Sequence, residues 1–236
     1  MATSLVLPCF NPPTGWEQNV CTNYHSICSR VQEQIELVIV IDGKSTMVTN
    51  ETLAFLQENI RKLKLISYPV NRGKGYAIRQ GVAAATGDVI IYTDIDFPYN
   101  AESIQAIYEA LNQDECDVAI GVKNETYYSH VRFFRRTISK CLRYLVSLFL
   151  SMPVTDTQCG LKGFRLNVAP LFLETTIDRY LFDLEFIRNC FKSKRYRVKA
   201  IPVILNEHVH FRSMNYRILI PEMANFIKLL LNNKNG

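Results

Sequence analysis

The chain has 236 residues, of which 48% are hydrophobic and 21% charged, and its formal net charge is +5 at pH 7. This composition excludes a disordered chain, and so small a positive surplus argues against nucleic-acid binding while it suits a phosphorylated ligand or an anionic membrane surface. Seven cysteines without a Cys-x-x-Cys pair exclude a secreted disulfide scaffold, so we expect a protein of the reducing cytoplasm. No run of about 18 uncharged apolar residues indicates a conventional membrane span.

Short apolar runs alternate with helical segments over the first half of the chain. The runs predict strands at 4–7, 35–41, 65–68, 88–93 and 116–122, and the segments between them predict helices at 16–31, 49–62, about 74–85 and 101–111. Parallel strands need helical crossovers, so this alternation predicts an α/β fold with a doubly wound, mostly parallel sheet. No basic region precedes the first apolar run, which indicates a strand and not a signal peptide.

Two aspartates, Asp94 and Asp96, follow the strand predicted at 88–93. Open α/β sheets bind their ligands at the carboxyl ends of the strands. Side chains at i and i+2 of an extended segment point to the same side. The two carboxylates are therefore expected to converge on one hard cation that holds a phosphorylated substrate.

A glycine-rich segment, 71–81, follows the third strand and opens a helix. Its small residues would let backbone N–H groups approach an anion, and the helix N-terminus adds positive potential, which favours a phosphate or nucleotide loop. An ordinary strand-to-helix turn explains the pattern equally well. The segment matches neither a Walker loop nor the glycine spacing of a dinucleotide fold, so both interpretations stay open.

The second half changes character. Residues 132–150 have the pattern of a basic amphipathic helix, which suits either a core helix with a solvated edge or a surface for membranes and lipid phosphate. A polar, glycine-containing loop at 156–164 is a candidate for substrate contact, with a capped turn as the alternative. A further helix is predicted over about 180–193, with Asp183 and Glu185 in its first turn, where acidic residues ordinarily complement the helix dipole.

Two more elements complete the pattern. A strand at 198–205 contains Pro202 and is expected at a sheet edge, because proline cannot donate to a neighbouring strand. A helix at 217–231 has one apolar face. No internal repeat or linker divides the chain, so residues 1–236 are expected to form a single domain.

Taken in order, these motifs resemble those of the inverting family 2 glycosyltransferases of GT-A fold. Within that family the chain is most similar to the polyprenyl- or dolichyl-phosphate sugar synthases, of the dolichyl-phosphate beta-glucosyltransferase type. The resemblance implies a nucleotide-sugar half at 1–122 and an acceptor half at 123–236. The motifs that carry it are Pro8-Cys-Phe-Asn11, Ile39-Val-Ile-Asp42-Gly43, Asn71-Arg-Gly-Lys-Gly75, Asp94-Ile-Asp96, Asp156-Thr-Gln-Cys-Gly160-Leu-Lys162 and Phe182-Asp183-Leu-Glu185.

The resemblance implies transfer of a sugar, with UDP-glucose the favoured donor, to a polyprenyl or dolichyl phosphate with inversion at the anomeric carbon. It also implies Mg²⁺ or Mn²⁺ on the donor diphosphate, where a dication neutralises the charge of the leaving group. By motif position the metal ligands would be Asp94 and Asp96; the nucleotide-sugar contacts Pro8, Phe10, Asp42, Asn71, Gly73, Lys74 and Asp94; the catalytic residues Asp156, Gln158 and Asp183; and the cations for the acceptor phosphate Arg132, Arg136 and Lys162.

Two alternatives stay open. A family 2 transferase that acts on a saccharide or protein hydroxyl would need a catalytic base, for which Asp156 or Asp183 is available. A catalytically silent nucleotide-sugar or lipid-binding module is the other alternative, and the presence of both metal-ligand aspartates argues against it. For the lipid-phosphate enzyme we expect peripheral binding to the cytoplasmic membrane face through 132–150 and 217–231, which flotation with anionic vesicles would test.

Overall fold

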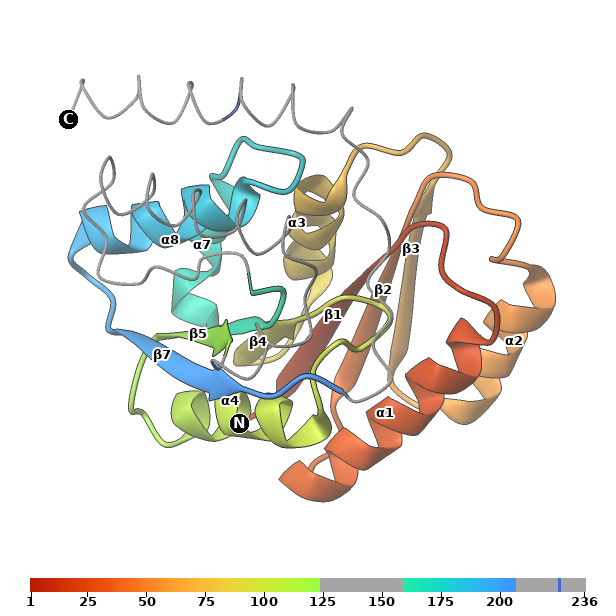
Figure 1. Cartoon of the computed structure of the whole chain (residues 1–236), viewed down its shortest axis with the longest axis horizontal. Helices are drawn as coiled ribbons and strands as arrows, with labels where there is room; N and C mark the ends of the chain where they lie inside the picture. Colours follow the sequence, from red (N-terminus) through yellow and green to blue (C-terminus); the bar gives the residue numbers. More distant parts are fainter. Residues whose placement is uncertain (124–158, 207–224, 226–236) are drawn as a thin grey trace, which may run out of the picture.

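The computed structural model describes residues 1–123, 159–206 and 225. These residues form one sheet of seven strands in the order β3-β2-β1-β4-β6-β5-β7 (Figure 1). All neighbouring strands are parallel except at β6, which is antiparallel to both β4 and β5. The strands are β1 (Thr3–Cys9), β2 (Glu36–Asp42), β3 (Leu63–Tyr68), β4 (Val89–Tyr92), β5 (Val118–Lys123), β6 (Lys162–Arg165) and β7 (Val198–Val203).

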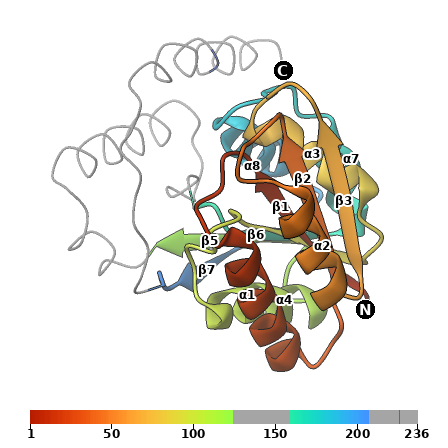
Figure 2. The ribbon, with the colours of Figure 1, turned by 90° about the vertical axis from the view of Figure 1, so that its right-hand side faces the viewer.

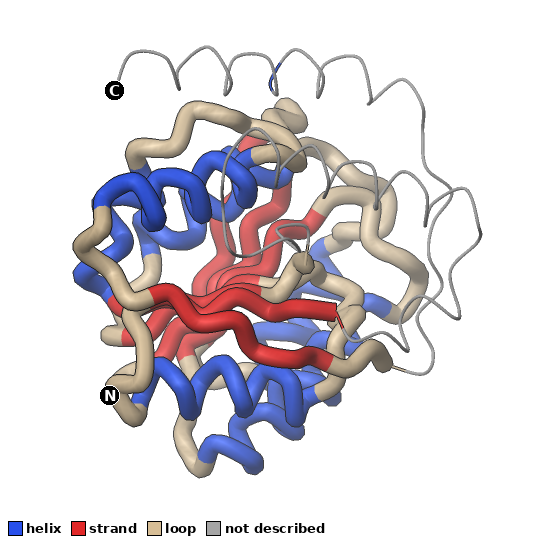
Figure 3. Tube along the Cα trace, turned by 60° about the vertical axis from the view of Figure 1, so that its left-hand side comes forward, coloured by secondary structure: helices blue, strands red, loops and turns tan. Residues whose placement is uncertain are grey.

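Helices cover both faces of the sheet, which explains why β1, β2 and β4 are apolar along nearly their whole length. Figure 3 shows helices on both faces of the sheet. One face packs against α1, α2 and α4, and the other against α3, α7 and α8. Figure 2 shows α1 and α4 side by side on the first of these faces. The helices are α1 (Trp16–Val31), α2 (Asn50–Asn59), α3 (Lys74–Ala84), α4 (Ala101–Asn112), α7 (Ala169–Leu173) and α8 (Phe182–Ser193), with a 3₁₀ turn at Leu166–Val168.

The structure confirms the doubly wound, mostly parallel sheet, the presence of the first five predicted strands and the edge position of the strand that contains Pro202. One prediction was wrong: part of the expected polar loop at 156–164 is the strand β6. The basic helix predicted at 132–150 lies outside the described residues, and so does the helix predicted at 217–231 except for Asn225, which is helical. Within the described ranges, no helix is long and apolar enough to cross a bilayer.

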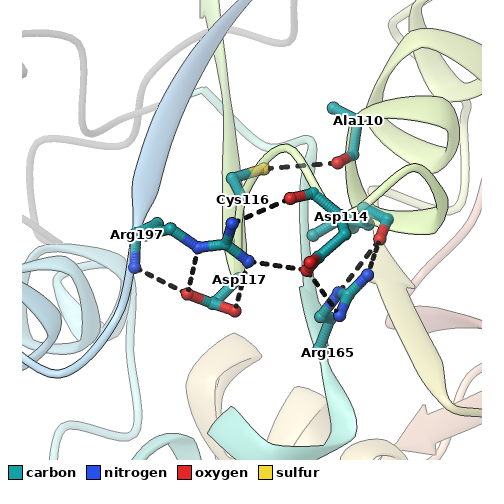
Figure 4. Close-up of polar contacts among 7 residues, drawn as sticks. Ala110, Asp114, Cys116, Asp117, Arg165 and Arg197 are labelled. Atoms are coloured by element: carbon teal, nitrogen blue, oxygen red, sulfur yellow. Dashed lines mark hydrogen bonds and ion pairs between the residues drawn. The ribbon is translucent and has the colours of Figure 1, made fainter.

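Charged side chains tie the last three strands together at the amino end of β5 and β7 (Figure 4). Arg197 Nη2 lies 2.6 Å from Asp114 Oδ1, and its Nε lies 3.2 Å from Asp117 Oδ2. Arg165, the last residue of β6, lies 2.8 Å from the same Asp114 carboxylate and donates two hydrogen bonds to the Leu111 carbonyl. We call Asp114, Asp117, Arg165 and Arg197 the amino-end network.

Candidate active site

Asp42, the last residue of β2, organises the glycine-rich segment. Its buried carboxylate accepts hydrogen bonds from the Asn71 side chain (2.8 Å) and from the backbone N–H groups of Arg72 (2.7 Å) and Gly73 (2.9 Å). Gly73 has a φ of 113°, a conformation that strongly favours glycine. Asp42 therefore fixes the path of this segment, which limits its predicted role as a direct nucleotide contact.

The backbone N–H groups at the start of α3 are already engaged by the chain itself. Gly75 N and Tyr76 N donate to the Asp178 carbonyl at 2.8 and 3.2 Å. A Cβ on Gly75 would lie 2.5 Å from the Ile177 carbonyl oxygen, so glycine is needed for this close packing. Of the two open interpretations of 71–81, the structure therefore favours the packed strand-to-helix turn over a phosphate loop of free N–H groups.

Lys74, the first residue of α3, places a positive charge at this site, where the backbone N–H groups of Gly75 and Tyr76 are already hydrogen-bonded. Its Nζ lies 2.5 Å from Asp94 Oδ1, and both side chains are partly exposed. Burial disfavours the charged ammonium, but the carboxylates of Asp94 and Asp183 outweigh that effect and hold the pKa of Lys74 above its usual value. Lys74 is therefore a permanent cation at the carboxyl end of the sheet.

Gly160 lies directly against this ion pair. A Cβ there would lie 2.6 Å from Asp94 Oδ2 and 3.6 Å from Lys74 Nζ. The Gly160 N–H donates to the buried Tyr99 hydroxyl at 3.3 Å. The sequence identifies Gly160 only as part of a motif. Its close approach to Asp94 joins residues that are 66 positions apart in the chain, so the residue type alone could not predict it.

The expectation that Asp94 and Asp96 lie on one extended segment was wrong. β4 ends at Tyr92, and the Phe97 N–H donates to the Asp94 carbonyl at 3.0 Å, which closes a turn with Phe97 at a φ of 46°. Asp94 is partly exposed and Asp96 is exposed. Both carboxylates therefore belong to one tight turn at the end of β4.

This turn suits a divalent cation. Carboxylate oxygens are the ligands that Mg²⁺ and Mn²⁺ prefer, and glycine at position 160 keeps the space beside Asp94 free of a side chain. No group of three or more His, Cys, Asp or Glu side chains that could hold a metal occurs in the described part of the chain. Asp94 and Asp96 would therefore hold such an ion together with phosphate oxygens and water, as Mg²⁺ sites commonly do.

Asp183 and Lys162 form a buried ion pair beneath the turn. Lys162 Nζ lies 3.1 Å from Asp183 Oδ2, and the Lys162 side chain is fully buried. The Tyr92 hydroxyl donates to Asp183 Oδ1 at 2.6 Å. This placement argues against the predicted roles of Lys162 as a direct ligand of the acceptor phosphate and of Asp183 as a free catalytic base, because each charge is used by the other.

Of the remaining predicted residues, some lie at the carboxyl end of the sheet and the others lie in the part of the chain that the structure does not describe. Phe10 is exposed just after β1, and Pro8 is partly buried within it, so both lie at the carboxyl end where a nucleotide contact is expected. Asp156, Gln158, Arg132 and Arg136 lie outside the described residues, and their roles stay predictions.

The comparisons with known proteins agree with this geometry. A model of the family Glycosyl transferase family 2 matches residues 4–170. The chain belongs to this family. It is 28% identical over 224 residues to the dolichyl-phosphate beta-glucosyltransferase of Saccharomyces cerevisiae, covering 86% of this chain and 66% of the relative. It is 29% identical over 166 residues to the enzyme of that name from Drosophila melanogaster, covering 64% of this chain and 50% of the relative. The chain thus spans between half and two thirds of these relatives.

Solved structures share the fold. Glucosyl-3-phosphoglycerate synthase from Mycobacterium tuberculosis, in complex with Mn²⁺, UDP and phosphoglyceric acid, superposes with a TM-score of 0.66 at 16% identity, covering 100% of this chain and 78% of that one. Mannosyl-3-phosphoglycerate synthase from Rubrobacter xylanophilus gives a TM-score of 0.65 at 13% identity, covering 98% and 73%. The GT-A architecture expected from the motifs is therefore confirmed.

Proposed function

We propose that the chain is a metal-dependent glycosyltransferase that moves glucose from UDP-glucose to dolichyl phosphate, with inversion at the anomeric carbon. The observation that carries the proposal is the Lys74–Asp94 pair held against Gly160 at the carboxyl end of the sheet. The relatives named dolichyl-phosphate beta-glucosyltransferase support the donor sugar and the acceptor. The UDP and Mn²⁺ in the Mycobacterium tuberculosis structure support the nucleotide and the cation.

The donor diphosphate would lie beside Asp94, Asp96 and Lys74. A divalent cation held by the two aspartates would neutralise the charge that builds on the leaving UDP. Lys74 keeps its proton, because the raised pKa of its ammonium is far from neutral pH, and it adds a second positive charge on the same group. When the diphosphate binds, Lys74 would exchange its contact with Asp94 for one with a phosphate oxygen.

A phosphate acceptor suits the state of Asp183. A dolichyl phosphate is largely dianionic at neutral pH, since its second pKa is near 6, so it attacks without a strong base. A hydroxyl acceptor needs one. Asp183 is committed to Tyr92 and Lys162, so of the two candidate bases the hydroxyl alternative would have to use Asp156. The phosphate acceptor is supported by the relatives named dolichyl-phosphate beta-glucosyltransferase. Peripheral binding at the cytoplasmic membrane face remains part of the proposal, since the acceptor is a lipid.

A transfer assay with the purified full chain tests the proposal. Radiolabelled UDP-glucose and dolichyl phosphate in detergent, with Mn²⁺ or Mg²⁺, should give labelled lipid, and EDTA should stop the reaction. GDP-mannose should not replace the donor, and thermal shift should show stabilisation by UDP with Mn²⁺ but not by GDP. Label released only as free glucose, or found only on a saccharide or protein, would contradict the proposal.

Asp94→Asn tests the metal role within the same assay. The variant keeps the size of the side chain but removes the charged ligand. A bound cation lowers the activation barrier by several kcal/mol, and each ~1.4 kcal/mol is tenfold in rate. We therefore expect turnover to fall on the order of 1000-fold. Asp117→Asn in the amino-end network is the matched control and should leave turnover unchanged. Full activity of Asp94→Asn would show that the assigned metal site is wrong.

A further inference from the structure

Three elements meet in a buried polar cluster directly beneath the candidate active site. Lys162 opens β6 and faces Tyr92, the last residue of β4, in the antiparallel register. Asp183 lies in the first turn of α8. Its carboxylate joins the other two, accepting from Tyr92 Oη at 2.6 Å and pairing with Lys162 Nζ at 3.1 Å. Lys162 Nζ also donates to the Cys159 carbonyl.

Two paths lead from this cluster to Asp94, one through Tyr92 and one through Lys162. Tyr92 precedes Asp94 by two positions, so fixing its ring fixes the start of the turn. Lys162 holds the carbonyl of Cys159, and the next residue, Gly160, stands against Asp94 Oδ2. Burial and then the Asp183 charge raise the pKa of Tyr92 well above its usual value, so the phenol stays protonated and donates.

Stability alone does not account for a charged pair at this place. Replacing a buried ion pair with apolar residues of similar volume is often neutral or stabilising, because desolvation offsets the attraction between the charges. The aromatic rings of Phe164, Phe172 and Phe182 surround Tyr92, so an apolar solution was available. The pair instead gives directional contacts to a carbonyl and a hydroxyl, which apolar packing cannot give.

We propose that Lys162 and Asp183 are a positioning pair, which acts through Tyr92 and Cys159 to hold Asp94 and Gly160 in the geometry that binds the cation and the diphosphate. The inference rests on the proposed function for the nature of that ligand. Neither residue touches the substrate. Their effect is on the groups that do.

The test compares two single variants on one strand, in each of which methionine replaces a cationic residue. Lys162→Met and Arg165→Met each remove a cation from β6. Because β6 runs antiparallel to its neighbours, Lys162 lies at the carboxyl end of the parallel strands and Arg165 at their amino end. Mn²⁺ affinity in the presence of UDP is measured by titration calorimetry, alongside thermal melting. Losing a residue that orients a metal ligand commonly lowers metal affinity by about 10- to 100-fold. We expect that loss for Lys162→Met and none for Arg165→Met.

A double variant separates positioning from folding. Lys162→Met alone leaves the Asp183 charge buried and unpaired, which can prevent folding. Lys162→Met with Asp183→Asn removes both charges and keeps an oxygen to accept from Tyr92. We expect this double variant to regain the melting temperature that Lys162→Met loses but not the Mn²⁺ affinity, since the Lys162 ammonium no longer donates to the Cys159 carbonyl.

The outcomes distinguish this inference from the proposed function. Wild-type Mn²⁺ affinity in the double variant, or an equal loss in Arg165→Met, would overturn the positioning pair. So would a wild-type chain that binds no Mn²⁺ with UDP. A shift in the pH profile of turnover in Lys162→Met would instead identify Asp183 as a base. A wild-type chain that binds Mn²⁺ and UDP but transfers no glucose to dolichyl phosphate would contradict the proposed function alone.

Discussion

The two ends of the sheet both gather charged residues, but they use them differently. At the amino end, the Arg197 and Asp114 side chains are 54% and 64% exposed, while those of Arg165 and Asp117 are 19% and 13% exposed, and these ions pair with one another at the strand ends (Figure 4). At the carboxyl end, Lys74 and Asp94 are 18% and 37% exposed, and Lys162 is fully buried. Charges that water screens contribute little to stability, whereas buried charges strongly constrain the groups around them.

Space differs between the two ends as well. In the amino-end network, two arginine side chains pair with two aspartates at the strand ends, and Arg197 also donates to the Asp114 carbonyl. At the carboxyl end, Gly160 leaves the carboxylate of Asp94 without a side-chain neighbour at that position. The first arrangement fastens strands together, and the second places the backbone of Gly160 close against the Lys74–Asp94 pair. Residue type alone does not distinguish the two ends of the sheet, because each contains aspartates paired with cationic side chains.

Gly160→Ala should break this distinction with an effect on turnover second to that of Asp94→Asn. Its added Cβ would lie 2.6 Å from Asp94 Oδ2, so the carboxylate must move. Misplacing a reacting group by about 1 Å can cost about 100-fold, roughly 2.7 kcal/mol, and we expect kcat/KM for UDP-glucose to fall by that factor. Steady-state kinetics with thermal melting measure both effects. The melting temperature should change little, because a flexible side chain can yield.

Gly87→Ala is the matched control at the opposite end. A Cβ there would lie 2.6 Å from the Ser4 backbone nitrogen, which cannot yield as a side chain does. Overpacking of this kind typically costs about 1–3 kcal/mol, so stability should fall while the folded fraction keeps its turnover. If Gly87→Ala lost turnover and Gly160→Ala did not, the division of roles between the two ends would be wrong.

The sequence predicts the sheet better than it predicts the site. Aliphatic runs of β1, β2 and β4 identify buried parallel strands because helices cover both faces. β6 was missed because it has only 4 residues and begins with a lysine. A charged residue predicts a loop unless its partner is known, and the partner of Lys162 is Asp183, on a helix that follows later in the chain.

The glycine-rich segment shows the same limit at the site itself. Gly73 and Gly75 predict close backbone approach, and the structure confirms it. What approaches is the chain's own carbonyl at Asp178, together with the carboxylate of Asp42, where a phosphate was one of two expectations. A sequence shows that a backbone is accessible, but only the fold shows which group takes the position.

Glu36→Gln tests how much the amino end contributes to stability. Ser4, Thr86 and Lys64 all bond to the Glu36 carboxylate. Burial would raise the pKa of this carboxyl, but those contacts together hold it at about 2, below its ordinary 4.5. The charged form is favoured on folding, so its stabilisation is complete above about pH 4.5 and is lost as the pH falls towards 2.

We therefore expect Glu36→Gln to lower the free energy of unfolding by on the order of 2 kcal/mol at pH 7, and by nearly nothing at pH 2. Urea unfolding at a series of pH values measures the difference. Turnover of the folded variant should match the wild type, since Glu36 opens β2 at the end away from Asp42. A constant difference across this range of pH would show that the charge of Glu36 is not the cause.

Arg197→Met should have the smallest effect of these changes. Exposed ion pairs contribute about 0–1 kcal/mol each, and about 1 kcal/mol shifts the melting temperature of a protein of this size by about 2–4 °C. We expect a fall within that range, a smaller one in 1 M salt because salt screens exposed charges, and no change in kcat. Thermal melting at low and high salt, with the transfer assay, measures all three. A fall in kcat at full folding would mean that the amino-end network reaches the active site through β6, which Arg165 and Lys162 share, and that the two ends of the sheet are coupled.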